Sequence, residues 1–151
     1  MEKDVSDSKK RFETIVQKFR ENHHKMTPQR IAIIDILSKS LGHPSVEDIY
    51  AQLKYDFPTM SLATVYRNIL LIKAMGEVLE LGFPDWNNRY DGNKPYPHPH
   101  VICIKCKKIV DPDLESLIHM EKEVSTETNF KILTHRLDFF GICGDCSAKK
   151  G

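Results

Sequence analysis

Two Cys-x-x-Cys pairs constrain this chain more than any other feature: Cys103 with Cys106, and Cys143 with Cys146. Each pair presents two thiolates to a tetrahedral ion, and two pairs complete a four-sulfur shell with no open position, which is typical of structural zinc. The 36 residues between the pairs exceed the usual ribbon spacing of about 15–20. We therefore expect Zn(II) to close a small α/β domain instead of a single hairpin.

The same four cysteines have two alternative interpretations. One is a thioredoxin-like redox pair, whose Cys-x-x-Cys opens a helix, and the other is four ordinary reduced thiols. Strand-like sequence follows Cys106, and Cys146 stands almost at the end of the chain, which favours metal binding. No run of 18 or more apolar residues occurs and residues 1–11 are charged, so we expect a cytoplasmic protein in a reducing compartment.

The overall charge neither indicates nor excludes a nucleic-acid partner. Lys and Arg total 22 against 21 Asp and Glu, which gives a formal net charge of +1. Nucleic-acid binders often carry a strong basic excess. Any case for DNA binding must therefore rest on how residues are arranged.

The first 80 or so residues carry helix periodicity and helix-start signals. Apolar residues recur at helical spacing between Phe12 and Phe19. Signals for three further helices are Thr27-Pro28, the capping box Ser45-Val-Glu-Asp48, and Ser61. We expect four helices in this half of the chain.

The helix expected from Ser61 to Ile72 has two distinct faces at about 100° per residue. Its apolar side comprises Leu62, Val65, Ile69 and Ile72. Its other side comprises Thr64, Arg67, Asn68 and Leu71, with Tyr66 at the edge of the apolar stripe. This pattern predicts one face packed on a core and the opposite face available to a partner.

The rest of the chain alternates strand signals with turn formers. A strand, a turn and a strand are expected between Val78 and Asp91, and helices followed by such a hairpin indicate a winged helix. Residues 92–97 are rich in turn formers and predict a linker. Beyond it we expect strands at 101–103 and 108–110, a helix at 114–127 and a strand at 130–140. The predicted class is α+β, with domains 1–91 and 98–151.

A second group of metal-ligand residues surrounds the first cysteine pair: Asp91, His98, His100 and Asp111. On an extended segment His98 and His100 point the same way, because side chains repeat every two residues. Nitrogen and oxygen donors without a thiolate suit Fe(II) or Mn(II). The alternative is a polar strand and loop, with Asp111 capping the helix that follows.

Several motifs together resemble the ferric uptake regulator family in order and spacing. They are Met26-Thr-Pro-Gln-Arg30, His43-Pro44, Asp48-Ile-Tyr50, Ser61-Leu-Ala-Thr-Val-Tyr-Arg-Asn68, His98-x-His-x-x-Cys-x-x-Cys106, His135-Arg-Leu137 and Gly141-x-Cys-x-x-Cys146. The resemblance runs from about residue 10 to the end. It implies an N-terminal winged-helix DNA-binding domain and a C-terminal dimerisation domain with a four-cysteine zinc site.

The resemblance also implies a regulatory Fe(II) or Mn(II) site made by His43, Asp91, His98, His100 and Asp111. Asp111 favours the peroxide-sensing branch, because iron-sensing members usually carry glutamate there. In that branch a ligand histidine, His43 or His98, is oxidised by peroxide when iron is bound. Two other features resemble the iron-sensing members as well: Arg67, and the spacing of seven residues from Asp91 to His98.

On this basis we expect a homodimer that binds a pseudo-palindromic double-stranded DNA operator. Tyr66 and Arg67, with Thr64 and Asn68 beside them, are the candidates for contacts to bases. The candidates for phosphate contacts are Lys25, Gln29, Arg30 and Arg89. For Lys25 and Arg89 the alternative is an ordinary solvated charge.

The expected function is a metal-dependent transcriptional repressor that senses peroxide, and not an enzyme. Within the family, the alternative is an iron-responsive or zinc-responsive repressor without peroxide sensing. Two other classes stay open: a mononuclear iron or zinc enzyme built on the His and Asp cluster, and a zinc-stabilised interaction module without DNA affinity.

Overall fold

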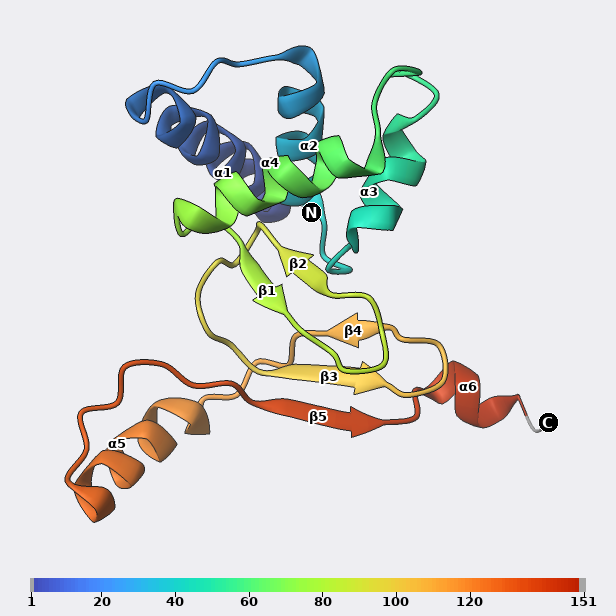
Figure 1. The fold of residues 1–151 in the computed structure, drawn as a ribbon. Helices are drawn as coiled ribbons and strands as arrows, with labels where there is room; N and C mark the ends of the chain where they lie inside the picture. Colours follow the sequence, from blue (N-terminus) through green and yellow to red (C-terminus); the bar gives the residue numbers. More distant parts are fainter. Residues whose placement is uncertain (1, 150–151) are drawn as a thin grey trace. The chain divides into compact units, whose positions relative to one another are not determined.

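The computed structural model describes the backbone of residues 2–149 and the side chains from Asp7 onward. Met1, Lys150 and Gly151, which the predicted domain ranges include, lie outside the described residues. The chain forms two compact units, residues 1–96 and 97–151. The first is mainly helical and the second contains a three-stranded sheet, so the predicted α+β class is confirmed (Figure 1).

Four helices form most of the first unit. They are α1 (Glu2–Glu21), α2 (Pro28–Lys39), α3 (Val46–Leu53) and α4 (Leu62–Ala74). The three predicted helix starts are confirmed: Thr27, Ser45 and Ser61 each accept a backbone N–H three residues on, and Asp48 completes the capping box at Ser45. These caps satisfy N–H groups that have no partner inside the helix, so they fix where each helix begins.

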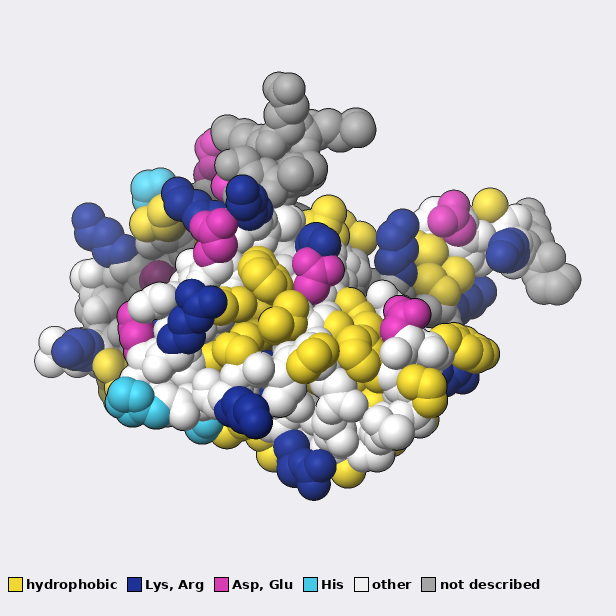
Figure 2. Space-filling model, turned by 90° about the horizontal axis from the view of Figure 1, so that it is seen from above, with side chains coloured by type: hydrophobic (Ala, Val, Ile, Leu, Met, Phe, Trp, Pro, Cys, Tyr) yellow, Lys and Arg dark blue, Asp and Glu magenta, His cyan; other side chains and the backbone are white. Residues whose placement is uncertain are grey.

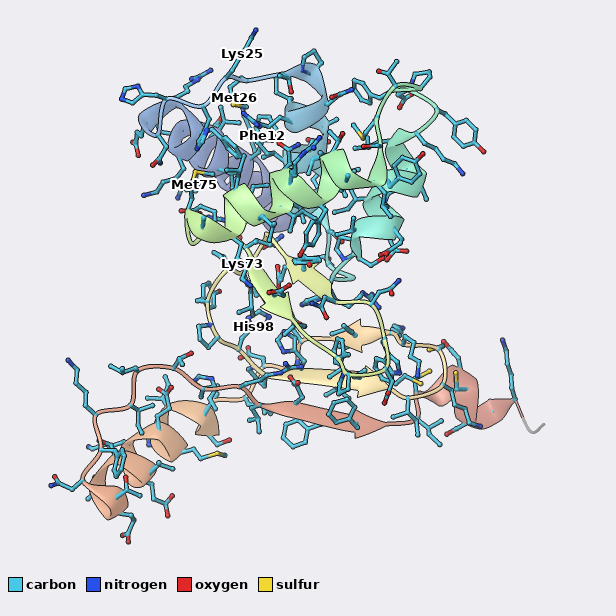
Figure 3. The ribbon with its side chains drawn as sticks, viewed as in Figure 1. Phe12, Lys25, Met26, Lys73, Met75 and His98 are labelled. Carbon is cyan, nitrogen blue, oxygen red and sulfur yellow. The ribbon has the colours of Figure 1, made fainter. Side chains whose placement is uncertain are left out.

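The hydrophobic core of the first unit lies between the four helices. Its fully buried members include Ile15, Phe19, Ile33, Ile34, Leu37, Ile49, Val65, Ile69 and Ile72. The partly buried Phe12, Met26 and Met75 pack against it (Figure 3). Because these residues come from every helix, burial of apolar surface holds the bundle together.

The predicted faces of α4 are partly wrong. Val65, Ile69 and Ile72 are buried as expected, but Leu62 is 41% exposed and Asn68 is only 7% exposed. The Asn68 amide donates to Thr64 O at 2.8 Å, and its Oδ1 accepts from Arg30 Nε at 2.8 Å. A polar side chain is stable at a buried position when its groups are hydrogen-bonded in this way.

A two-stranded antiparallel hairpin follows α4 and completes the arrangement expected of a winged helix. Its strands are β1 (Leu79–Leu81) and β2 (Arg89–Asp91), with Glu80 opposite Tyr90. The buried Tyr90 hydroxyl donates to Glu80 Oε1 at 3.0 Å. Burial and the Glu80 carboxylate raise the pKa of Tyr90, so this hydroxyl keeps its proton.

Arg11 of α1 ties the end of the hairpin to the rest of the unit. Its guanidinium donates to Glu77 Oε2 at 3.0 Å, to Glu77 O at 3.2 Å and to Gly92 O at 3.0 Å. Asn93 Nδ2 donates to Ser38 O at 3.2 Å. The first residues of the predicted linker 92–97 are therefore held by the helical unit.

The second unit contains a sheet, one longer helix and a short C-terminal helix. The sheet order is β4–β3–β5, with β3 (His100–Cys103) antiparallel to β4 (Ile109–Val110) and parallel to β5 (Asp138–Gly141). The helices are α5 (Ser116–Thr128) and α6 (Gly144–Ala148). The predicted strand 130–140 is wrong in extent, because strand structure begins only at Asp138, where the chain pairs with β3.

This second unit has a very small hydrophobic core. Apart from Pro99, its buried hydrophobic side chains among the described residues are Ile102, Cys103 and Ile109. Larger apolar side chains such as Ile118, Phe130 and Leu133 are more than two-thirds exposed. Domains with so little buried apolar surface usually depend on a metal, disulfides or a partner subunit.

Charged and apolar side chains are mixed on the face of the molecule drawn in Figure 2. Figure 2 shows one face on which hydrophobic side chains gather near the centre, with Lys and Arg side chains around them.

No helix within residues 2–149 is both long and apolar enough to cross a membrane.

Candidate metal centres and DNA-reading helix

The four cysteines come together at one end of the second unit. Cys103 ends β3, Cys106 follows in the turn, Cys143 precedes α6, and Cys146 lies within it. Their Sγ atoms all lie within 4.8 Å of one another, with Cys106 and Cys143 3.7 Å apart. The parallel pairing of Cys103 with Gly141 brings the two distant pairs together, as their spacing in the sequence required.

Backbone groups and neighbouring thiols set different pKa values within this cluster. The backbone N–H of Cys143, 3.3 Å from Cys103 Sγ, and that of Cys106 lower the pKa of Cys103 to about 6. Hydrogen bonding with the Cys143 and Cys106 thiols raises the pKa of Cys146 to about 12. A thiolate at Cys103 is therefore ready near neutral pH, and four sulfurs with no oxygen or nitrogen donor fit a tetrahedral zinc ion.

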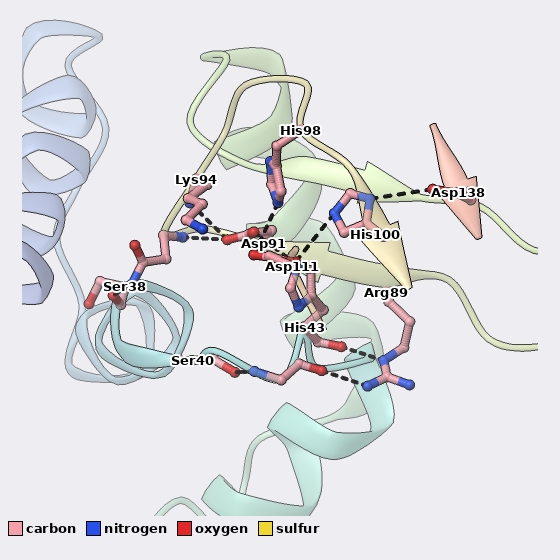
Figure 4. Close-up of polar contacts among 12 residues, drawn as sticks. Ser38, Ser40, His43, Arg89, Asp91, Lys94, His98, His100, Asp111 and Asp138 are labelled. Atoms are coloured by element: carbon pink, nitrogen blue, oxygen red, sulfur yellow. Dashed lines mark hydrogen bonds and ion pairs between the residues drawn. The ribbon is translucent and has the colours of Figure 1, made fainter. Parts of the chain in front are cut away.

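His43 and Asp91 form a buried pair inside the first unit (Figure 4). His43 Nε2 lies 3.0 Å from Asp91 Oδ2, and the two side chains are only 1% and 2% exposed. The other oxygen of Asp91 accepts the backbone N–H groups of Asn93 and Lys94, each at 2.8 Å. These bonds fix the carboxylate, so its remaining oxygen faces the imidazole.

Arg89 holds the loop that carries His43. Its guanidinium donates to the carbonyl oxygen of His43 and to that of Gly42, the latter at 2.7 Å (Figure 4). His43 itself has a φ of +53°, a left-handed conformation that non-glycine residues rarely adopt. Burial lowers the pKa of Arg89. The structure therefore gives Arg89 an intramolecular role, and its phosphate contact stays a prediction.

His98, His100 and Asp111 converge inside the second unit. The imidazole rings are 4.4 Å apart between centroids. Asp111, just after β4, has one oxygen 3.2 Å from His98 Nε2 and the other 3.8 Å from His100 Nε2. The expected same-side arrangement of the two histidines gives a nitrogen and oxygen donor set without sulfur, which fits Fe(II) or Mn(II) better than the cysteine cluster does.

Sequence reasoning missed a carboxylate beside this cluster. Asp138 Oδ1 lies 3.3 Å from His100 Nδ1, and its Oδ2 accepts from Arg136 Nε at 2.6 Å. Only the β3–β5 register, which places His100 opposite Asp138, shows this relation. The sequence offered no signal for it beyond the strand-like residues that follow.

The predicted DNA-contacting residues fall into two groups. Tyr66 is 47% exposed on α4, Arg67 is exposed beside it, and Thr64 and Gln29 are half-buried. Lys25 is exposed before α2. Arg30, in contrast, packs its guanidinium 4.7 Å over the Phe19 ring and bonds Asn68, and burial lowers its pKa. Asn68 and Arg30 therefore support one another inside the unit.

The sequence profile described as the Ferric uptake regulator family matches residues 21–140. This chain belongs to that family. The peroxide operon regulator of Bacillus subtilis is 39% identical over 135 residues, covering 89% of this chain and 92% of the relative. The peroxide-responsive repressor PerR of Staphylococcus saprophyticus is 38% identical over 138 residues, covering 91% and 93%. The predicted resemblance to this family and to its peroxide-responsive members is confirmed.

Solved structures of family members share the fold. The ferric uptake regulator of Helicobacter pylori, described as having three functional metal-binding sites, superposes with a TM-score of 0.81 at 23% identity and covers 93% of this chain and 96% of its own. PerR from Streptococcus pyogenes, described in terms of peroxide sensing and gene regulation, is 35% identical, with a TM-score of 0.52 and coverage of 89% and 92%.

Proposed function

We propose that this chain is a metal-dependent transcriptional repressor that responds to peroxide, and not an enzyme. The observation that carries the proposal is that one chain contains both a four-sulfur cluster and buried His and Asp donors in each of its two units. Relatives named as peroxide-responsive regulators, matched over about nine-tenths of their length, support the same conclusion.

Two ions of different chemistry have different roles in this proposal. Zn(II) is held by the four cysteines and stabilises the second unit, whose own core is small. Fe(II) or Mn(II) is held jointly by His43 and Asp91 of the first unit and His98, His100 and Asp111 of the second. Metals low in the affinity order exchange more readily, so this second ion can report its supply.

The proposed partner is a pseudo-palindromic double-stranded DNA operator, bound by a homodimer. The domains are residues 1–91 for DNA binding and 98–151 for dimerisation, joined by 92–97. In this arrangement α4 enters the major groove, where Arg67 can bond guanine and the Tyr66 ring can contact a thymine methyl. In the same proposal Thr64 supports the contacts to bases, and Lys25 and Gln29 contact phosphates.

Metal controls DNA binding if it favours one arrangement of the two units. A ligand shifts such an equilibrium only by its differential affinity, and a change from 1:99 to 99:1 requires about 5.5 kcal/mol. An ion with ligands in both units supplies that difference, because its full shell forms in only one arrangement. His43 is decisive, since it belongs to the DNA-binding unit.

Peroxide sensing is proposed to act on the same ligands. Bound Fe(II) would supply redox chemistry with peroxide that Mn(II) would not supply. The net change adds one oxygen atom to an imidazole carbon of His43 or His98 and releases water, so peroxide is reduced and the imidazole is oxidised. The oxidised ring binds metal more weakly, which ends repression.

The test is operator binding by His43→Ala and, as a matched control, by His119→Ala, an exposed histidine on α5. Band shifts with Mn(II) should show binding by the wild type and the control but not by His43→Ala, with zinc content and helix content unchanged. Normal operator binding by His43→Ala would refute the shared ion.

Intact mass after peroxide treatment tests the sensing step. The Fe(II) form should gain one oxygen atom, and the Mn(II) form should gain none. Equal insensitivity of both forms, with metal-dependent operator binding retained, would instead indicate an iron- or zinc-responsive repressor without peroxide sensing.

A further inference from the structure

Asp138 lies on the side of His100 that faces away from Asp111. His100 Nδ1 is 3.3 Å from Asp138 Oδ1, whereas His100 Nε2 is 3.8 Å from Asp111 Oδ1 (Figure 4). The two ring nitrogens point in different directions, so an ion bound at Nε2 with Asp111 is out of reach of Asp138. The side chain of Asp138 is only 8% exposed, and that of His100 is 1% exposed.

The backbone fixes this contact. His100 and Asp138 are direct partners in the parallel β3–β5 ladder, and His100 N donates to Leu137 O at 3.0 Å. Directly opposite residues on one face of a sheet have neighbouring side chains. Arg136 then holds the far oxygen of Asp138 at 2.6 Å. Asp138 therefore lies between Arg136 on one side and the His100 imidazole on the other.

We propose that Asp138, held by Arg136, is a positioning residue for His100 and fixes the imidazole with its proton on Nδ1. A carboxylate is an acceptor only, so it stabilises the neutral form that donates from Nδ1 and leaves the Nε2 lone pair directed toward Asp111. Histidines that bind metals usually donate their second N–H to a carboxylate, a backbone carbonyl or a water, and loss of that partner lowers metal affinity about 10–100-fold. This inference rests on the proposed role of His98, His100 and Asp111 as regulatory ligands.

The arrangement predicts a specific effect of Asp138→Asn. Arg136 can only donate, so it takes the amide oxygen of the new side chain and leaves the NH₂ group facing His100 Nδ1. The imidazole then accepts at Nδ1 and carries its proton on Nε2, where the metal must bind. Titration of zinc-loaded protein with Mn(II), with free Mn(II) followed by electron paramagnetic resonance, should show affinity reduced about 10–100-fold.

A double variant separates this role from a merely structural one. Without Arg136 the amide is free to turn its oxygen toward Nδ1, so Arg136→Ala with Asp138→Asn should bind Mn(II) several-fold more tightly than Asp138→Asn alone. Additive damage, with the double variant weaker than either single one, would overturn the proposal. Asp56→Asn, an exposed site in the first unit, is the control and should bind as the wild type does.

Nitrogen-15 NMR of the histidine rings provides a readout that needs no regulatory metal. In the zinc-loaded wild type without Mn(II), neutral His100 should carry its proton on Nδ1, and in Asp138→Asn on Nε2. A wild-type proton on Nε2 refutes the positioning role whether or not any variant folds. If the tautomer is as expected but the wild type shows no Mn(II) site sensitive to His98→Ala, the proposed function fails and the positioning of His100 stands.

Discussion

Replacing Gly92 by alanine tests how tightly the end of the hairpin is packed. A Cβ at this position would lie 2.8 Å from Leu37 Cβ, 3.0 Å from Leu37 O and 3.1 Å from Leu37 C. Two of these three atoms belong to the backbone of α2, so they cannot rotate away. To reach an ordinary contact of 3.4 Å, the Cβ pair must separate by 0.6 Å, because 3.4 minus 2.8 is 0.6.

Overpacking of this kind in a well-packed region costs about 1–3 kcal/mol. The substitution also displaces the Gly92 carbonyl, which accepts a hydrogen bond from Arg11 Nε at 3.0 Å. A hydrogen bond of this type contributes about 0.5–1.5 kcal/mol. We therefore expect the free energy of unfolding of the first unit to fall by about 2 kcal/mol. With a urea m value of about 2 kcal/mol per molar, the midpoint should move by roughly 1 M.

The same displacement should reach the proposed metal ligands, because Asp91 directly precedes Gly92 and lies 3.0 Å from His43. Binding constellations tolerate errors of only about 0.5 Å, so Mn(II) affinity should fall together with stability. The control is Gly82→Ala, whose Cβ would meet only Asn88 Oδ1 at an ordinary 3.7 Å. Urea denaturation followed by circular dichroism compares the two. Equal midpoints for Gly92→Ala and Gly82→Ala would show that a Cβ at Gly92 is not overpacked against Leu37.

Two further predictions concern the four-cysteine cluster and the hairpin. Cys106→Ser should lose zinc, measured by elemental analysis, and make the second unit sensitive to limited proteolysis, because that unit buries little apolar surface; a folded, fully zinc-loaded variant would contradict this. Lys73 Nζ donates to Glu80 Oε2, and this contact lowers the pKa of the Glu80 carboxyl below its ordinary 4.5. The stabilising effect of the Glu80 carboxylate is therefore complete above that value and is lost as pH falls. Glu80→Gln should therefore flatten the acid side of the stability profile, and an unchanged acid slope would argue against the pair.

Local signals made much of the first unit predictable. The caps at Thr27, Ser45 and Ser61 involve groups three residues apart in the chain, so the sequence contains everything that determines them. The cysteine cluster was predictable for a different reason: four sulfurs at paired spacing have few uses other than a shared ion. Neither inference required knowledge of tertiary contacts.

The residues on the buried face of α4 were not predictable from periodicity alone. Hydrophobicity placed Asn68 outside, but its amide is satisfied by Thr64 O and by Arg30, which is 38 residues away in sequence. A polar residue becomes a good core residue only through such partners. Periodicity carries no information about a partner on another helix, and Leu62 shows the reverse error at the exposed start of the same helix.

Strand pairing limited the prediction of the second unit. Phe130 and Ile132 have side chains typical of a strand, yet this segment pairs with no strand in the described structure. The strand begins at Asp138, where β3 provides a partner. The contact between Asp138 and His100 depends on that register. A one-residue shift would turn Asp138 to the other face of the sheet, so the position of Asp138 beside the proposed metal ligands could not be predicted without the strand pairing.

Strand β3 begins at His100 and ends at Cys103, so two ligand groups share one backbone only about 10 Å long. Damage at the sulfur end will therefore be transmitted to the nitrogen end. Chelation or oxidation of the thiols should silence a repressor whose histidines are chemically intact. A cysteine variant that fails to repress is therefore no evidence that its thiols sense peroxide. Identifying the sensing residue requires a direct measurement of histidine oxidation.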